Sequence, residues 1–167
     1  MDRLWAPWRM GYIDGIGTNE GGDACFLCAA RDAKDDRAAL VFARRERALA
    51  VLNRFPYNNG HTLVVPHEHR GDLADLAEAD LLALLTLARD VMGAMRGFMR
   101  PDGFNVGFNF GRTAGAGLPG HLHLHIVPRW NGDTNFMPVL GDTKVIPQSL
   151  EALYDQIRAA MDGAAKA

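Results

Sequence analysis

The stretch at residues 121–127 reads His-Leu-His-Leu-His-Ile-Val and decides the fold expected for this chain. Because the side chains of an extended strand alternate between faces, the three histidines share one face, and Leu122, Leu124 and Ile126 share the other. Neighbours on one face lie roughly 6.5–7 Å apart, since a strand rises about 3.3 Å per residue. That separation suits three imidazoles grouped around one small anion or metal ion. We therefore expect an apolar face toward the core and a reactive histidine face.

Two kinds of chemistry fit this histidine row. In a three-histidine zinc site the ligands must converge on bonds of about 2 Å, which a flat strand with this spacing does poorly. Phosphate chemistry fits better, because a neutral imidazole can attack phosphorus while neighbouring histidines hydrogen-bond the phosphate oxygens. His123 has a histidine on each side and is therefore the expected nucleophile. The remaining alternative is an exposed polar strand face that happens to be rich in histidine.

A glycine-rich loop precedes the row, with four glycines in residues 111–120. Such a loop lets backbone N–H groups approach a phosphate closely. It lacks the Gly-Lys-Ser/Thr of a Walker loop. On its own it would more often be a plain connection, but next to the histidine row a phosphate site is favoured.

The rest of the chain predicts mostly strands. Two apolar runs, residues 38–43 and 48–53, flank a charged tetrapeptide and indicate a β-hairpin. An Asn-Gly step at residues 59–60 predicts a turn before a further strand over 61–66. Residues 104–110 alternate apolar with small or polar residues, as a strand with one buried face does.

Helices are expected at two places. Residues 77–98 carry an apolar stripe at helical spacing, which we assign to the core rather than to an interface. The stripe comprises Leu81, Leu84, Leu85, Ala88, Met92 and Met95. A last short helix fits the spacing of Leu150, Tyr154, Ile157 and Met161. The fold class is therefore α+β, an antiparallel sheet covered by a long central helix and a C-terminal helix.

Composition excludes several other classes of protein. A chain of 167 residues suits one domain, here residues 1–167 with a tail over 162–167 that we expect to fray. With 18 basic and 20 acidic residues the net charge is −2, so we expect neither nucleic acid nor membrane as a partner. The longest nearly apolar run, residues 81–88, is far shorter than the roughly 20 residues of a membrane span. The first residues lack the apolar stretch of a secretory signal, and two cysteines make no disulfide framework, so we expect a cytoplasmic protein.

Cys25 and Cys28 form a Cys-x-x-Cys pair and are the only cysteines. Such a pair can be half of a zinc site, a redox couple or a coincidence. A redox pair usually follows a strand, whereas this one follows a glycine-rich stretch, which argues against a redox role. A tetrahedral zinc site needs two more ligands, and histidines are available for it.

Taken together, these motifs resemble the histidine-triad superfamily of nucleotidyl hydrolases and transferases. Residues 121–127 match its central signature, and residues 52–53, 60–66 and 103–111 follow its expected order. The stretches 4–9, with Trp5 and Trp8, and 132–136 are similar to its bacterial diadenosine-polyphosphate branch. The resemblance covers most of residues 4–150. It implies the HIT-like α+β fold and a homodimer built through the central helix and a sheet edge.

The resemblance also implies roles for individual residues. His123 attacks the α-phosphate of a nucleotide to form a covalent nucleotidyl-histidine, His125 hydrogen-bonds the phosphate, and the His121 backbone sets the tautomer of His123. Asn53 binds the ribose hydroxyls, with a turn residue as the alternative, and Asn109 contacts the phosphate, with a structural strand-end residue as the alternative. Three loop residues complete the nucleotide site: Gly115, Ala116 and Gly117. We expect His61 to support the active strand by hydrogen bonding rather than to react.

A structural zinc ion is the one cofactor that the resemblance implies, and no organic cofactor is expected. Its ligands would be Cys25, Cys28, His69 and His121, with His67 as the alternative to His69. All four coordination positions would then be filled by protein, which leaves none for activating water.

The expected activity is cleavage of the α-phosphate linkage of a dinucleoside polyphosphate such as diadenosine tetraphosphate. Many hydrolases of the superfamily carry a glutamine after the Ala-Gly of the loop, but here Ala114-Gly115 is followed by Ala116-Gly117. The final acceptor is therefore open between water and inorganic phosphate. The alternatives are a nucleoside phosphoramidate or adenylate hydrolase of the same superfamily and a non-catalytic nucleotide-binding sensor.

Overall fold

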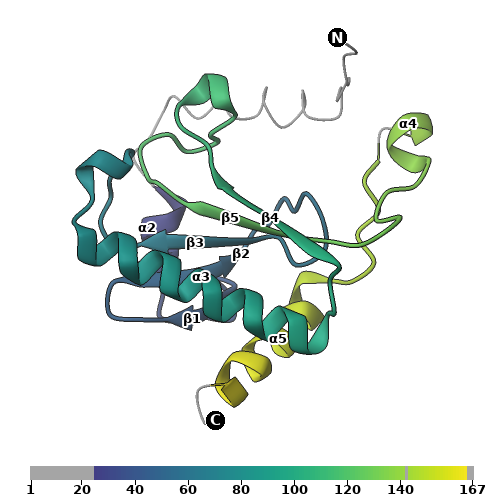
Figure 1. Cartoon of the computed structure of the whole chain (residues 1–167), viewed down its shortest axis with the longest axis horizontal. Helices are drawn as coiled ribbons and strands as arrows, with labels where there is room; N and C mark the ends of the chain where they lie inside the picture. The colour runs from purple at the N-terminus through teal and green to yellow at the C-terminus, as the bar shows by residue number, and fades with distance from the viewer. Residues whose placement is uncertain (1–24, 142, 165–167) are drawn as a thin grey trace.

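The computed structural model describes residues 25–141 and 143–164, which fold around one five-stranded sheet with every neighbouring pair antiparallel. The strand order is β1-β2-β3-β5-β4, so β1 and β4 are the edges. The expected α+β class is confirmed (Figure 1). The expectations for residues 4–9 and for the end of the tail lie outside the described residues.

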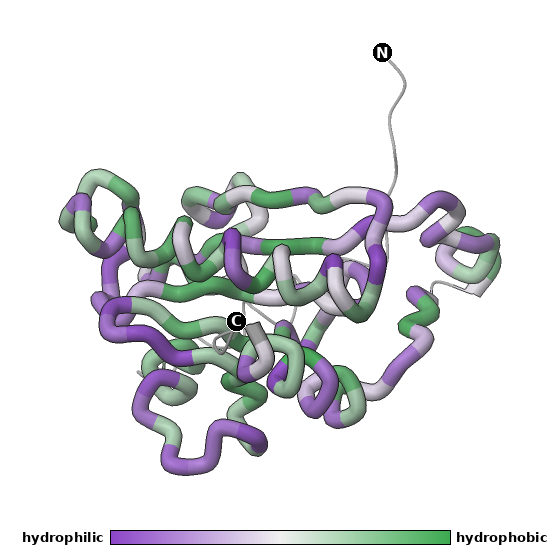
Figure 2. Tube along the Cα trace, turned by 60° about the horizontal axis from the view of Figure 1, so that its bottom comes forward, coloured by the Kyte–Doolittle hydropathy of each residue, from purple (hydrophilic) through white to green (hydrophobic). Residues whose placement is uncertain are grey.

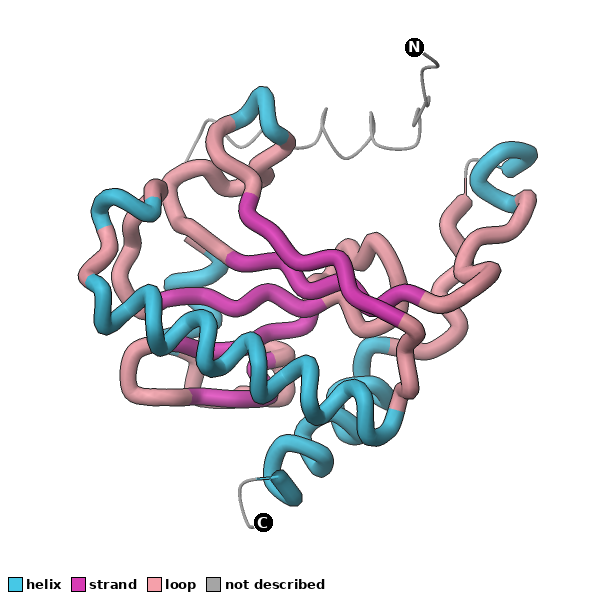
Figure 3. The backbone as a smooth tube through the Cα atoms, viewed as in Figure 1, coloured by secondary structure: helices cyan, strands magenta, loops and turns pink. Residues whose placement is uncertain are grey.

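The elements have the following bounds. The strands are β1 Val41–Arg44, β2 Ala48–Leu52, β3 Thr62–Pro66, β4 Gly103–Phe108 and β5 Leu124–Arg129. The α-helices are α2 Phe26–Asp32, α3 Glu78–Phe98, α4 Met137–Gly141 and α5 Leu150–Ala164, and two 3₁₀ turns, η2 and η3, cover Leu73–Asp75 and Arg112–Ala114. Figure 3 shows how strands and helices alternate with the longer loops.

The expected hairpin and third strand are confirmed as β1, β2 and β3. Every residue of β2 and β3 is buried, which fits their nearly continuous apolar sequences. Helix α3 crosses the sheet and contacts β2 and β3 (Figure 1). Figure 2 shows hydrophobic residues concentrated along these inner strands and hydrophilic residues in the outlying loops.

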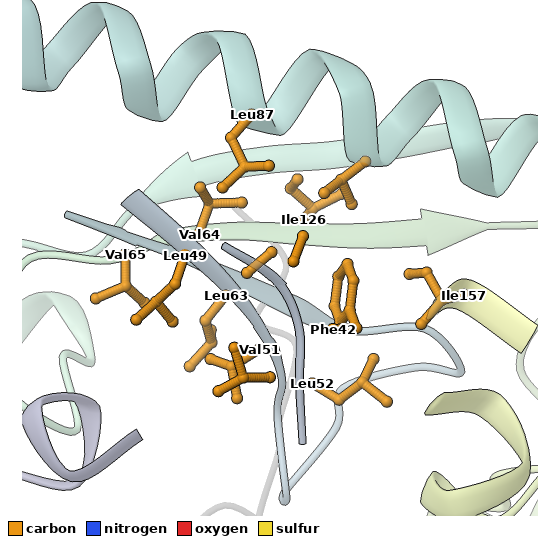
Figure 4. Close-up of a cluster of buried hydrophobic side chains, with 14 of the residues drawn as sticks. Phe42, Leu49, Val51, Leu52, Leu63, Val64, Val65, Leu87, Ile126 and Ile157 are labelled. Carbon is orange, nitrogen blue, oxygen red and sulfur yellow. The ribbon is translucent and has the colours of Figure 1, made fainter. Parts of the chain in front are cut away.

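Helix α3 has the predicted length and buries one stripe on the sheet. Leu87 points from α3 toward the strands, beside Val64 and Ile126 (Figure 4). The buried residues of the stripe include Leu84, Ala88 and Met95, as expected. The prediction for Leu85 is wrong: it is 57% exposed, because the buried stripe runs instead through Leu84, Leu87, Ala88, Val91 and Met95 at helical spacing, and Leu85 is turned away from it. The helix ends where Pro101 prevents its continuation.

Helix α5 extends the core toward the C-terminus. Three of the four side chains at the predicted spacing, Tyr154, Ile157 and Met161, are buried, as is Leu153, whereas Leu150 is only half-buried. The helix packs against α3 and β1, and Ile157 lies beside Phe42 of β1 (Figure 4). The core therefore continues through Met161, past residue 150.

Strand β4 differs from the expectation of one buried face. None of its residues is fully buried: Phe104 and Phe108 are half-buried against the core, and Val106 is exposed. The reason is that no described helix packs extensively on β4, whereas α5 covers the other edge strand, β1, which is buried over most of its length.

The histidine stretch joins the sheet later than predicted. Strand β5 begins at Leu124, and its pairing with β3 starts at Val64↔Leu124. Before that point Leu122 N–H donates to Arg70 O, 2.6 Å away, after the chain has left β3 at Pro66. The apolar face is nevertheless confirmed, since Leu122, Leu124 and Ile126 are all buried.

Among the described helices, none combines the length and the apolar character that crossing a bilayer would require.

Candidate functional site

The candidate site lies where the start of β5 runs beside β3. The register pairs Leu63 with His125, so His61, two residues before Leu63, lies diagonally opposite His125 on the same face. The rings of His61 and His125 have their centroids 5.2 Å apart, and those of His123 and His125 are 4.9 Å apart. The sheet therefore gathers three histidines, and one of them comes from outside the row.

His123 is held as a neutral ring with a defined tautomer. Its Nδ1 lies 2.8 Å from the backbone oxygen of His121, and because a carbonyl only accepts, Nδ1 must donate. The side chain is buried, and burial lowers its pKa below the usual range despite the opposing effect of that hydrogen bond. The neutral ring therefore keeps its lone pair on Nε2, which is the state a nucleophile needs.

His61 lies behind His125 and is fully buried. Its Nε2 is 2.9 Å from His125 Nδ1, and its own Nδ1 accepts the Tyr57 backbone N–H at 3.0 Å. Burial lowers the pKa of His61 to about 3, with smaller contributions from His125 and His123. The ring is neutral at physiological pH and supports the active strand, as expected.

Asn53 is engaged in a turn next to His61. Its Oδ1 accepts the Phe55 backbone N–H at 2.9 Å, and its Nδ2 lies 3.3 Å from His61 Nδ1. The first contact is the short local bond typical of an Asx turn, so the turn role considered for this residue is present. Binding of ribose hydroxyls by Asn53 stays a prediction.

Asn109 lies beside His125, where a phosphate contact is expected. Its Nδ2 is 3.5 Å from His125 Nε2 and 3.5 Å from Gly115 O, so it joins the histidine site to the glycine loop. Both separations are at the long limit for a hydrogen bond. The amide is close enough to the histidines to touch a group bound there.

The glycine loop is folded on itself. The Gly115 N–H donates to Arg112 O at 2.9 Å, and the buried Ala116 donates to Gly111 O at 3.2 Å. Gly115 has φ 88°, a left-handed conformation that favours glycine. Two of the three residues expected to offer amides to a phosphate therefore use them inside the loop, and Gly117 is the third. Phosphate binding by this loop stays a prediction.

A second cluster of side chains lies around the His121 ring, away from the His123–His125 pair. The ligand atoms of Cys25, Cys28, His69 and His121 all lie within 4.8 Å of one another. His121 Nδ1 is 3.2 Å from Cys25 Sγ, and His69 Nδ1 is 3.2 Å from Cys28 Sγ. The expectation that the three imidazoles of the row surround one ion is wrong, because the His121 ring faces this cluster and not the His123–His125 pair.

The donor set of this cluster fits zinc. Two thiols and two imidazoles are a common tetrahedral combination. His121 Nε2 lies 3.0 Å from Pro66 O and must donate to it, which leaves Nδ1 unprotonated toward the sulfurs. A backbone carbonyl on the second nitrogen is the usual support for a metal-bound histidine.

Between the two candidate histidines, the geometry selects His69. His67 points elsewhere, and its Nε2 is a buried atom without a hydrogen-bond partner among the described residues. Cys25 caps the N-terminus of α2, where the Cys28 N–H donates to its sulfur at 3.3 Å. At the start of this short helix both sulfurs therefore lie close to His121 Nδ1, Cys25 Sγ at 3.2 Å and Cys28 Sγ at 3.5 Å.

Tyr57 is a site residue that the sequence did not reveal. Its ring stacks on that of His125, with the ring centroids 5.9 Å apart and an interplanar angle of 16°. Its ring centroid also lies 4.5 Å from that of His61. The available signal was an aromatic residue four positions before a histidine, in a turn, which is too common to single out.

The fold and this geometry define an α+β protein in which a buried His123, bonded to the backbone at His121 O, lies beside a Cys2His2 cluster. Sequence comparison agrees, since the family model described as the HIT domain matches residues 34–132. The chain belongs to the HIT domain family, which confirms the resemblance.

Two curated relatives illustrate the range of the family. An "AP-4-A phosphorylase" of Mycobacterium tuberculosis (strain H37Rv) is 39% identical over 154 residues, which is 90% of this chain and 79% of the relative. "Adenosine 5'-monophosphoramidase hnt1" of Schizosaccharomyces pombe is 28% identical over 134 residues, 80% of this chain and 96% of the relative.

Solved structures agree on the fold. A Zn-bound histidine triad family protein from Mycobacterium smegmatis superimposes with a TM-score of 0.68 at 28% identity, covering 86% of this chain and 96% of that protein. A diadenosine triphosphate hydrolase from Plasmodium falciparum gives a TM-score of 0.61 at 20% identity, covering 79% of each chain, and at that identity it supports the fold alone.

Proposed function

We propose that this protein cleaves the α-phosphate linkage of dinucleoside polyphosphates, with diadenosine tetraphosphate as the leading substrate, through a covalent nucleotidyl-histidine on His123. The observation that carries the proposal is the 2.8 Å bond from His123 Nδ1 to His121 O on a buried neutral ring, which directs the lone pair to Nε2. The relative named AP-4-A phosphorylase, similar over 90% of the chain, supports this choice of substrate.

The reaction would take place in two displacements at one phosphorus. In the first, His123 Nε2 forms a bond to the α-phosphorus, and the bridging P–O bond breaks, so that the leaving nucleotide departs with the electron pair. The imidazole then carries a positive charge, which the His121 carbonyl stabilises through Nδ1–H. In the second, an oxygen of the acceptor attacks phosphorus and the P–N bond breaks, which restores neutral His123. His125 would hydrogen-bond the phosphate throughout.

Inorganic phosphate is the acceptor that we favour, because the 39% identical relative is named a phosphorylase. Diadenosine tetraphosphate would then yield ATP in the first step and ADP in the second. Incubation with and without phosphate tests this choice: ADP plus ATP formed only with phosphate supports phosphorolysis. AMP plus ATP would indicate hydrolysis by the same intermediate, and two ADP would contradict attack at the α-phosphate.

The intermediate itself gives the direct test. Rapid acid-free quenching with a labelled substrate should trap one nucleotide per chain on wild-type protein and none on His123→Asn, which should still bind the substrate. Asparagine keeps a polar side chain of smaller size but has no nucleophilic nitrogen. Turnover that survives in His123→Asn, or absence of any trapped nucleotide during wild-type turnover, would refute the mechanism.

The relative named a monophosphoramidase supports a second candidate reaction, the cleavage of a nucleoside phosphoramidate. Attack by His123 on a nucleoside phosphoramidate would form the same nucleotidyl-histidine and release an amine. Comparing kcat/KM for the two substrate classes on one preparation separates these activities, and binding of either without turnover would indicate a nucleotide sensor.

A structural zinc ion held by Cys25, Cys28, His69 and His121 is part of the proposal. The ion would have no open position and so would supply rigidity rather than chemistry. It would fasten α2 to His121, the residue whose carbonyl orients the nucleophile.

We further propose a homodimer that uses the outer side of α3 and the β4 edge. Leu82 and Leu85 of α3 are 68% and 57% exposed, and Val106 of β4 is 46% exposed. Exposed large apolar side chains, and a strand edge that has no partner among the described strands, are both typical of an interface. We place the protein in the cytoplasm, where a reducing environment would keep Cys25 and Cys28 available to zinc.

A further inference from the structure

The histidine site has an exposed strand face on its β4 side. The register pairs Gly107 with His125, so Gly107 lies on the face of the sheet that carries the histidines, and Asn105 follows on that face two residues away. Helix α3 packs on the opposite face, beside Ile126 (Figure 4). Both Gly107 and Asn105 are exposed. A ligand held at the histidines can therefore extend along β4.

Gly107 has no side chain, although nothing in the described part of the chain requires a glycine there. It lies inside a strand, without the left-handed φ for which glycine is needed. A Cβ at this position would have no heavy atom within 4 Å apart from its chain neighbours. Glycine inside a strand weakens the strand and often marks a place where a ligand or another backbone comes close. Gly107 therefore leaves room for a ligand directly beside His125.

Asn105 presents a hydrogen-bond donor further along the same face. Its Oδ1 accepts a hydrogen bond from Arg129 Nη1 at 2.7 Å, and its Nδ2 has no hydrogen-bond partner among the described residues. Arg129 is itself held, because its Nε and Nη2 donate to the two carboxylate oxygens of Asp133 at 2.5 and 3.0 Å. The amide of Asn105 is therefore oriented before any ligand binds, and the cation on its oxygen strengthens its N–H groups as donors.

The substituents of an α-phosphate bound at the histidines must leave the phosphorus on different sides. His61 and Tyr57 lie on the β3 side of His125. Asn53, the residue expected to bind ribose, lies next to His61. The nucleoside that stays on the enzyme would therefore lie on the β3 side. The bridging oxygen and the phosphates beyond it would then extend over the β4 side, where Gly107 leaves room.

We infer that Gly107 and Asn105 form a leaving-group subsite, which binds the phosphates beyond the α-phosphate of the dinucleoside polyphosphate. Asn105 Nδ2 donates to an oxygen of this phosphate chain, and Gly107 gives the chain room to pass. The two residues lie about 7 Å apart along the strand, so the phosphate at Asn105 is beyond the one at His125. The inference rests on the proposed function and adds the residues that select a substrate with a long phosphate chain. The opposing view is that Gly107 makes room for a second protein chain at the β4 edge.

Two ligands that share the α-phosphate but differ beyond it test the inference. Diadenosine tetraphosphate reaches the leaving-group subsite, whereas AMP ends at the α-phosphate. Calorimetric titration of His123→Asn, which should bind but not react, gives Kd for both ligands. Adding Asn105→Ala should raise Kd for diadenosine tetraphosphate about tenfold, the usual loss for one hydrogen bond to a charged oxygen, and should leave Kd for AMP unchanged. With His123 intact, Asn105→Ala should lower kcat/KM for diadenosine tetraphosphate by a similar factor.

Gly107→Val tests the room beside His125. Valine favours strands, so the variant should be at least as stable as the wild type. Its branched side chain should fill the space over which the phosphates pass, and the preference for diadenosine tetraphosphate over AMP should fall by about tenfold or more. Val106→Thr is the matched control, because Val106 lies between Gly107 and Asn105 but on the other face of β4, and its ligand preference should not change.

Equal rises of Kd for both ligands in Asn105→Ala, or an unchanged Kd for diadenosine tetraphosphate, would overturn the inference. A Gly107→Val protein that loses its oligomeric state but keeps its ligand preference would show that the glycine makes room for a second chain, and would overturn the inference too. These outcomes do not depend on catalysis. Absence of a trapped nucleotide on His123 would refute the proposed function even if the ligand preference changes as expected, so the two failures are distinguishable.

Discussion

Burial of His61 makes a quantitative prediction about how stability depends on pH. The ring has a pKa of about 3 in the folded protein, compared with an ordinary value of 6.5. The unfolded chain therefore binds a proton on His61 below about pH 6.5, whereas the native state stays neutral down to about pH 3. Protons bound by the unfolded state favour unfolding, so the contribution is present above pH 6.5 and is lost progressively as the pH falls toward 3.

The size of the effect follows from linkage. One group that is protonated only in the unfolded state changes the free energy of unfolding by about 1.4 kcal/mol per pH unit once the pH is well below 6.5. Between about pH 8 and pH 5 the integrated loss is about 2 kcal/mol. This is a large part of the 5–15 kcal/mol typical of a domain.

Urea unfolding of wild type and His61→Gln at a series of pH values measures the contribution of His61 to the free energy of unfolding. Glutamine does not titrate, so the difference in unfolding free energy between the two proteins should shrink by about 2 kcal/mol from pH 8 to pH 5, in the direction that favours the variant at low pH. Protonation of the cysteine and histidine ligands affects both proteins equally and cancels in the difference. A difference that is independent of pH would refute the reasoning, because it would mean that His61 titrates alike in both states.

Three further outcomes are expected. Cys28→Ser should abolish stoichiometric zinc by elemental analysis and should lower Tm much more than kcat, because a zinc ion held by four protein ligands has no open coordination position for catalysis. Wild-type protein that contains no zinc, and whose Tm is unchanged by a chelator, would contradict this. Leu85→Asp should shift the protein from dimer to monomer in analytical ultracentrifugation, because the exposed Leu85 would lie in the proposed interface. An unchanged dimer mass would contradict an interface at this position. Leu84→Ala should lower the free energy of unfolding measured in urea by about 3 kcal/mol, whereas Leu82→Ala on the exposed side of α3 should lower it much less. Equal losses in the two variants would contradict the orientation of α3.

Local patterns predicted most of the secondary structure. The apolar run at residues 48–53, followed by the Asn-Gly turn and the strand predicted over 61–66, identified β2 and β3, and helical spacing identified α3 and α5. These signals are local, because the period of a strand or helix is contained in a few consecutive residues. Errors arose where burial depends on which elements meet in space. Strand β4 lacks a buried face because no described helix packs extensively on it, and Leu85 is exposed because α3 presents another side to the sheet.

For the site, the sequence predicted a reactive residue but not the contacts around it. The histidine row at residues 121–127 and the Cys-x-x-Cys pair supplied three members of the Cys2His2 cluster and the expected nucleophile His123, and the family resemblance supplied the fourth member, His69, with His67 as the alternative. It did not show that His121 turns away from the other two, that Tyr57 stacks on His125, or that the amides of Gly115 and Ala116 bond within their own loop.

The order of residues along the chain thus determined the family, the antiparallel α+β design and the choice of His123 as the expected nucleophile, because each is carried by a short run with its own spacing. Only the folded structure decided which nitrogen of each ring holds the proton. That choice depends on single hydrogen bonds, in which His123 Nδ1 donates to His121 O and the Tyr57 backbone N–H donates to His61 Nδ1. Such bonds require atoms from distant segments to meet within about 3 Å, and no local period of the sequence specifies a distance of that kind.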